Sequence, residues 1–199
     1  SYRLFQTVEY WPEGTTFISV VDPGVGSKRK SVVALTENNQ YIVTPDNGTL
    51  TYIKTHVGIK AIREISEVKN RRQNTEYSYT FHGRDVYAYT GAKLASGHIT
   101  FEEVGPELTV DAVLELPVVE TVIGDNFVCG AVDILDVRFG SLWTSIKRED
   151  FYTLEPEFGD RFEVTISNND MLVYQNQVTY GKSFADVRIG QPILYINSL

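Results

Sequence analysis

Hydrophobic residues in the first half of the chain gather in short β-branched and aromatic runs, with polar turns between them. Four of these runs predict strands: Thr15–Val21, Ser31–Leu35, Gln40–Thr44 and Ile59–Ile65. The first is typical of a buried strand, whereas the last mixes apolar and charged residues. Thr49–His56 and Val86–Leu94 predict helices, whereas the polar stretch Ser66–Ser78 predicts a loop. This order of elements predicts an α/β domain, a Rossmann-like mixed sheet with helices, over residues 1–116.

The pattern changes near residues 105–117 to short alternating strands without useful helical periodicity. The strand-like runs are Phe127–Val132, Leu142–Ile146, Arg161–Ile166, Met171–Tyr174 and Pro192–Ile196. Short, evenly spaced strands favour a small antiparallel barrel or a sandwich. We therefore predict a second, all-β domain over residues 117–199, either a small barrel or a sandwich.

Composition narrows the classes of partner. The chain has a net charge of −8, whereas binding to nucleic-acid phosphates needs clustered Lys and Arg, so we expect no nucleic-acid partner. No apolar run approaches the ~20 residues that span a bilayer, so we expect no membrane partner. The only cysteine is Cys129, which excludes an intrachain disulfide and fits a reducing cytoplasm. His56, His82 and His98 lack metal-ligand spacing, so no metal site is predicted.

Candidate chemistry falls at the ends of two predicted strands and at one helix start. Asp22-Pro23-Gly24-Val25-Gly26 follows the first strand, and Pro45-Asp46-Asn47-Gly48 follows the third; open α/β sheets bind ligands at such junctions. Asp46 and Asn47 are thus candidates for a pocket loop, although aspartates also simply start turns. His82 precedes a helix, whose positive end favours a neutral imidazole able to accept a proton or hold water. The alternative is that His82 only caps the helix and packs.

These motifs together carry a family resemblance. Four motifs, in this order along the chain, resemble those of the S-adenosyl-L-methionine hydroxide adenosyltransferases. They are the two turns just described, then Thr80-Phe81-His82-Gly83-Arg84-Asp85, then Phe139-Gly140-Ser141-Leu142-Trp143-Thr144-Ser145-Ile146. These enzymes are the water-using relatives of the fluorinase and chlorinase. The resemblance implies an N-terminal α/β domain, a C-terminal β-barrel and a homotrimer with substrate bound between subunits.

The resemblance also implies a reaction, in which water or hydroxide attacks ribose C5′ of S-adenosyl-L-methionine and releases methionine and adenosine. S-adenosyl-L-methionine is the substrate, and no cofactor is implied. The water-activating residues of the family correspond to Asp22, Arg29 and His82. The implied substrate-binding residues are Phe81, Gly83, Asp136 for the methionine ammonium, Phe139 and Phe184 beside adenine, Ser141, and Ser198 at the methionine carboxylate.

Departures from the family keep two alternatives open. The halogenase branch has a tyrosine-containing turn where Asp22 stands and a halide-contacting serine where Gly83 stands, so the hydrolytic branch is favoured. Ser141 and Ser145 replace asparagines that offer paired amide hydrogen bonds, which leaves a non-catalytic binding module as the second alternative. The first residues read like the middle of a helix and lack an initiating Met. We therefore expect both ends to be truncated, with a family strand missing before Ser1 and another after Leu199.

Overall fold

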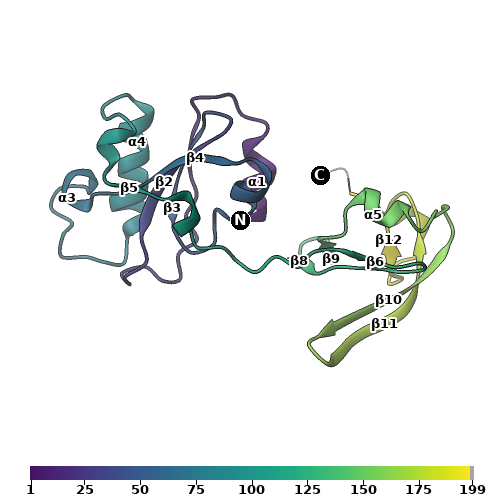
Figure 1. Cartoon of the computed structure of the whole chain (residues 1–199). Helices are drawn as coiled ribbons and strands as arrows, with labels where there is room; N and C mark the ends of the chain where they lie inside the picture. Colours follow the sequence, from purple (N-terminus) through teal and green to yellow (C-terminus); the bar gives the residue numbers. More distant parts are fainter. Residues whose placement is uncertain (198–199) are drawn as a thin grey trace. The chain divides into compact units, whose positions relative to one another are not determined.

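The computed structural model describes residues 1–197, and the chain forms two compact units. The first unit is Ser1–Pro117, and the second begins at Val118. Figure 1 labels the helices and strands of both. In residues 1–197 no helix is both long and apolar enough to cross a bilayer.

The first unit is built on a five-stranded mixed sheet. Its strands are β1 (Thr16–Ile18), β2 (Ser31–Thr36), β3 (Tyr41–Pro45), β4 (Ile59–Glu64) and β5 (Glu107–Leu108). They lie in the order β1-β3-β2-β4-β5. Only β1 and β3 pair in parallel, and the other pairs are antiparallel. The mixed α/β fold is therefore confirmed, whereas a Rossmann-like sheet, which is mostly parallel, is not.

Helices cover both faces of this sheet (Figure 1). They are α1 (Tyr2–Val8), α2 (Thr51–His56), α3 (Glu67–Asn70), a π-helix η1 (Gly83–Ala88), α4 (Tyr89–Ala95), and the 3-10 turns η2 (Glu102–Val104) and η3 (Val110–Ala112). Side chains along a strand alternate between faces. Accordingly, Val32 and Ala34 pack with Leu4 and Ile53 of α1 and α2, while Val33 packs in the core that holds η1 and α4. Helix α3 lies inside the stretch predicted to be a loop; it is only four residues long and too short to show a period.

Within residues 118–197 the second unit contains three small sheets. Its elements are β6 (Val122–Ile123), β7 (Val128–Cys129), β8 (Val132–Asp136), β9 (Ser141–Thr144), α5 (Arg148–Tyr152), β10 (Arg161–Asn168), β11 (Met171–Tyr180), η4 (Phe184–Asp186) and β12 (Ile193–Leu194). The sheets are β6-β7, β8-β9 and β10-β11-β12.

The predicted barrel is wrong for the part of the chain that the structure describes, since none of these sheets closes. Alternation encodes which face of a strand is apolar, but closure depends on register and tilt between hairpins, which alternation does not specify. Instead, α5 supplies a small aromatic core. The Phe151 ring centroid lies 5.3 Å from that of Phe162 and 5.2 Å from that of Tyr180.

Candidate active site

The loop between β1 and β2 carries a buried ion pair. Arg29 Nε donates to Asp22 Oδ1 at 2.9 Å, and Arg29 Nη2 donates to Asp22 Oδ2. The two side chains are only 11% and 5% exposed, respectively. A two-pronged guanidinium–carboxylate pair fixes both groups in one plane. Gly26 lets this loop lie close to the Tyr79 backbone. At its φ of +78° a side chain would be strained, and a Cβ would lie 3.0 Å from the Tyr79 carbonyl oxygen.

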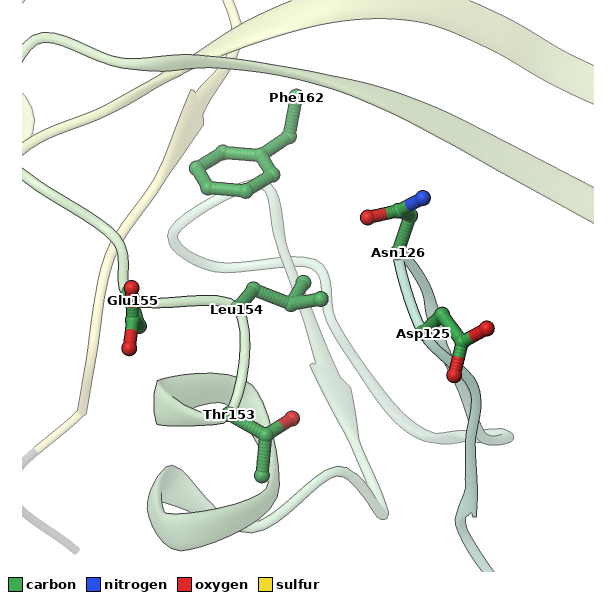
Figure 2. A pocket seen from close by; sticks show the side chains of 6 residues that line it. All are labelled: Asp125, Asn126, Thr153, Leu154, Glu155 and Phe162. Atoms are coloured by element: carbon green, nitrogen blue, oxygen red, sulfur yellow. The ribbon is translucent and has the colours of Figure 1, made fainter.

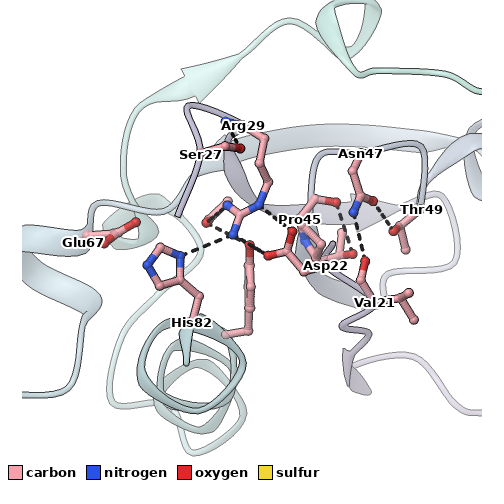
Figure 3. A network of polar contacts seen from close by, with 12 residues as sticks. Val21, Asp22, Ser27, Arg29, Pro45, Asn47, Thr49, Glu67 and His82 are labelled. Carbon is pink, nitrogen blue, oxygen red and sulfur yellow. Dashed lines mark hydrogen bonds and ion pairs between the residues drawn. The ribbon is translucent and has the colours of Figure 1, made fainter. Parts of the chain in front are cut away.

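His82 completes the group from the other side of the site. It stands at the N-terminus of η1, and its Nδ1 lies 3.3 Å from Arg29 Nη2. Figure 3 shows this contact together with the Asp22–Arg29 pair. Because arginine has only hydrogens to donate, Nδ1 is the acceptor and the neutral ring carries its proton on Nε2. Nε2 is buried and has no hydrogen-bond partner within residues 1–197.

The electrostatics favour the neutral imidazole. Burial, the largest effect, lowers the pKa of His82; Glu67 opposes this shift, and the positive charge of Arg29 adds to it. The sequence argument relied on the helix end, whereas the structure points first to desolvation. His82, distant in the sequence, thus meets the Asp22–Arg29 pair through Arg29. The neutral ring carries its proton on Nε2, and Arg29 donates to both neighbours.

Two residues in this site were missed by the sequence reasoning. Ser31 Oγ accepts from Arg29 Nη1 at 2.9 Å and lies 3.0 Å from Tyr87 Oη, which in turn is 3.5 Å from Asp22 Oδ2. Burial raises the pKa of Tyr87 to about 12, so its hydroxyl stays protonated near neutral pH. Ser31 and Tyr87 look like ordinary strand and helix residues in the sequence, which gave no signal for them.

The two strand-end turns do meet at one edge of the sheet, as expected from the parallel pairing of β1 and β3. Asn47 Nδ2 donates to the Val21 carbonyl oxygen at 2.9 Å and so joins the turns. The Asp46 carboxylate accepts from the Leu114 backbone N–H at 2.9 Å. That contact gives Asp46 a structural role, because it ties the segment at Leu114 to this turn.

Phe81 and Gly83 flank His82. The Phe81 ring is exposed, with the Arg84 guanidinium 5.1 Å from its centroid. Gly83 leaves room for a side chain, because a Cβ there would lie 3.6 Å from Val20 Cγ1, an ordinary contact. An apolar surface therefore adjoins the imidazole.

The remaining predicted residues lie in the second unit. Asp136 and Ser141 face each other across the β8–β9 hairpin, and the exposed Phe139 lies in its turn. Ser141 Oγ is 3.3 Å from Tyr195 Oη, and the Phe184 ring meets the Tyr195 ring edge-on at 5.0 Å. Tyr195, which sequence reasoning missed, therefore links Ser141 to Phe184. Ser198 lies outside the described residues.

None of these site residues belongs to the lining of two hollows in the described residues, one in each unit. One, of about 420 Å³, is lined in the second unit by Asp125, Asn126, Thr153, Leu154, Glu155 and Phe162 (Figure 2). The other, of about 250 Å³, is lined in the first unit by Thr7, Trp11, Thr15, Thr16, Phe17 and Ile18. Residues 1–197 hold no group of three or more His, Cys, Asp or Glu side chains able to bind a metal ion.

The fold and the site define a two-unit α/β protein with a buried carboxylate–guanidinium–imidazole group at the carboxyl edge of a mixed sheet. Comparison with known families gives the class a name. Residues 1–105 match the SAM hydroxide adenosyltransferase N-terminal domain, and residues 130–199 match the C-terminal domain of the same family. The chain belongs to the SAM hydroxide adenosyltransferase family.

Individual relatives agree with this assignment. The (R)-S-adenosyl-L-methionine hydrolase of Methanocaldococcus jannaschii is 35% identical over 75% of this chain and 49% of its own length. The hydrolase of Thermus thermophilus is 32% identical over 100% of this chain and 70% of its own length. A crystal structure of a conserved protein from Thermotoga maritima superposes with a TM-score of 0.82 at 33% identity, covering 99% of this chain and 71% of that one. Proteins named fluorinase are more distant, at 25–28% identity. The chain thus spans between half and about 70% of the length of these relatives.

Proposed function

We propose that this protein hydrolyses S-adenosyl-L-methionine to adenosine and L-methionine, by in-line attack of water at ribose C5′. The observation that carries the proposal is the buried meeting of Asp22, Arg29 and His82. The names of the relatives at 32–40% identity support the substrate. A sulfonium is already a good leaving group, so the main task is to hold and activate a poor nucleophile.

Counting hydrogens and lone pairs suggests how the three residues divide this task. Arg29 has five N–H hydrogens, and four of them are engaged: two by Asp22, one by Ser31 and one by His82 Nδ1. With Nδ1 accepting and Nε2 protonated, the neutral imidazole has no free lone pair for a proton. The Asp22 carboxylate has about four acceptor sites, of which Arg29 occupies two and the Tyr87 hydroxyl one, so one site on Oδ1 is left.

We therefore assign the proton of the attacking water to the Asp22 carboxylate. The His82 Nε2–H has no partner within residues 1–197 and lies on the side of the ring away from Arg29 (Figure 3), so His82 acts on the pair through the contact of its Nδ1 with Arg29 Nη2. Arg29 stabilises the negative charge that develops on the water oxygen. General-base help of this kind contributes about 10²–10⁴-fold to the rate.

The proposal includes a homotrimer with sites between subunits. Its support is the exposed aromatic surface beside His82: Phe81 precedes it in the chain, the Tyr79 ring centroid lies 6.3 Å from that of His82, and both side chains are 59% exposed. Apolar surface next to a catalytic group favours cover by substrate or by a second copy of the chain. Asp136, Phe139, Ser141 and Phe184 would supply the methionine and adenine contacts. A cytoplasmic location is proposed on the single free thiol, Cys129.

The decisive experiment incubates the protein with S-adenosyl-L-methionine in water enriched in oxygen-18 and follows adenosine and methionine by chromatography and mass spectrometry. Label in the adenosine 5′-hydroxyl is expected. Adenosine without label would refute direct attack at C5′. Asp22→Asn is the matched variant, expected to lower kcat by at least 10²-fold while retaining the ligand.

Two outcomes would favour the alternatives. Tight binding of S-adenosyl-L-methionine without products would indicate a binding module; here Ser145 Oγ already accepts from the Ala131 N–H at 2.9 Å. A 5′-chloro-5′-deoxyadenosine product in the presence of chloride would indicate a halogenase. Light scattering completes the test, because a fully active monomer would contradict an intersubunit site.

A further inference from the structure

Two hydroxyl groups behind the Asp22–Arg29 pair close a ring of hydrogen bonds. Arg29 Nη1 donates to Ser31 Oγ at 2.9 Å, Ser31 Oγ lies 3.0 Å from Tyr87 Oη, and Tyr87 Oη lies 3.5 Å from Asp22 Oδ2. The ring ends where it began, since Asp22 accepts from Arg29. Ser31 is 5% exposed and Tyr87 0% exposed, so solvent does not compete for these hydroxyls.

The ring has a direction. A guanidinium only donates and a carboxylate only accepts, so the two hydroxyls between them each have one hydrogen to pass on. Every hydrogen is used within the ring when Ser31 donates to Tyr87 and Tyr87 donates to Asp22. Such a chain of bonds, begun and ended by charged groups, is stronger than isolated neutral contacts.

The π-helix η1 brings Tyr87 to this place. His82 and Tyr87 are five residues apart, which in an α-helix is about one and two-fifths turns and would point them to different sides. The i→i+5 spacing of a π-helix instead stacks such residues on one side, and π-turns are frequent at functional sites. Both side chains accordingly reach Arg29: His82 Nδ1 at 3.3 Å, and the Tyr87 ring centroid at 5.5 Å from Cζ.

We propose that Tyr87 and Ser31 are positioning residues that hold the Asp22 carboxylate and the Arg29 guanidinium at the rotation used in the proposed hydrolysis. The χ2 torsion, which rotates the carboxylate of an aspartate, has a broad distribution unless neighbouring groups hold the carboxylate. Tyr87 touches Asp22 on the oxygen that also binds Arg29 Nη2, leaving a lone pair of Oδ1 for water. Because neither residue is exposed to a ligand, their loss affects the chemical step and leaves binding intact. This inference depends on the proposed function for its kinetic readout but not for its structural one.

The kinetic test compares Tyr87→Phe, Ser31→Ala and the double variant. Each single variant is expected to lower kcat about 10- to 100-fold with KM changed less than about twofold, because misplacing a catalytic group by a fraction of an ångström costs rate rather than affinity. The double variant should be no slower than the slower single one, since either change opens the same ring. Unchanged kcat in Tyr87→Phe, or losses that multiply in the double variant, would overturn the proposal. Tyr41→Phe is the control: this tyrosine begins β3, at the strand end opposite the site, and packs on Phe101 at 5.8 Å.

Crystal structures separate this proposal from the hydrolysis itself. In Tyr87→Phe the Asp22 carboxylate and the Arg29 guanidinium are expected to rotate together, because their two-pronged contact is stronger than the single 3.5 Å contact that is lost. If Tyr87→Phe fails to fold, Ser31→Ala, which removes one small hydroxyl, serves instead. An unrotated Asp22 in the variant would overturn the ring, even if the parent hydrolyses its substrate. A rotated Asp22 in Tyr87→Phe, together with a parent that shows no turnover, would support the ring and refute the proposed function alone.

Discussion

Replacing Asp22 by Asn tests how much the buried pair at the site stabilises the first unit. Asn keeps the shape of the side chain but removes its charge, and Arg29 then stays 11% exposed without its counter-ion. Breaking a buried ion pair by removing one partner costs about 3–5 kcal/mol. Against a typical total stability of about 5–15 kcal/mol, that is a large fraction.

Urea unfolding measures this cost. The chain has two tryptophans, Trp11 in the first unit and Trp143 in the second, so a Trp143→Phe background lets Trp11 fluorescence follow the first unit. With a urea slope of about 1–3 kcal/mol per molar, a loss of 3–5 kcal/mol lowers the midpoint by at least about 1 M. Asp22→Leu combined with Arg29→Met should recover much of the loss, because apolar replacement of both partners removes the unpaired buried charge.

The control is a pair whose carboxylate is open to solvent. Arg63 Nη2 lies 3.1 Å from Glu107 Oε2, and the two side chains are 17% and 66% exposed. Glu107→Gln should cost no more than about 1 kcal/mol, as for other solvent-exposed pairs. If Asp22→Asn costs no more than Glu107→Gln, or if the double variant is the least stable, the reasoning about a buried, mutually dependent pair is refuted.

Three further predictions concern the same unit. Burial lowers the pKa of His82 below 6.5, so as pH falls below about 6.5 the unfolded chain binds a proton that the native state does not. Stability therefore declines with falling pH, and His82→Gln should flatten that slope in urea titrations; parallel slopes for variant and parent would contradict it. The free energy of unfolding of Gly83→Ser should lie within about 1 kcal/mol of that of the parent, since a Cβ there meets only a valine methyl at 3.6 Å. In the presence of chloride this variant should still yield adenosine and no chlorinated nucleoside. Gly105→Ala should cost at least about 2 kcal/mol, because its φ is +154° and a Cβ would lie 2.2 Å from the Glu64 carbonyl oxygen. Gly97→Ala, with φ +70° and open space around it, is the matched control, and equal losses at both glycines would show that the Glu64 contact is irrelevant.

Several elements of the fold followed from local pattern. The buried strands β2, β3 and β4 lie within one residue of the runs expected for them, because their apolar β-branched residues have few alternatives to a sheet interior. The strand expected at Thr15–Val21 was too long, since only Thr16–Ile18 pairs with β3. The helix expected at Val86 starts earlier, as the π-helix at Gly83, because a wider turn has no distinct period in so short a stretch.

The site divides in the same way. The sequence by itself determined which side chains carry charge and a titratable ring, and that Asp22 and His82 stand at a turn and at a helix start. Only the tertiary structure decided that they share Arg29, that Nδ1 of His82 is the acceptor, and that Ser31 and Tyr87 close the ring. It also decided that the second unit forms three open sheets in its described part. The physical reason is the same in each case: charge, turn chemistry and alternation are local properties of the chain, whereas hydrogen-bond direction, burial and sheet closure depend on partners that only folding brings within reach.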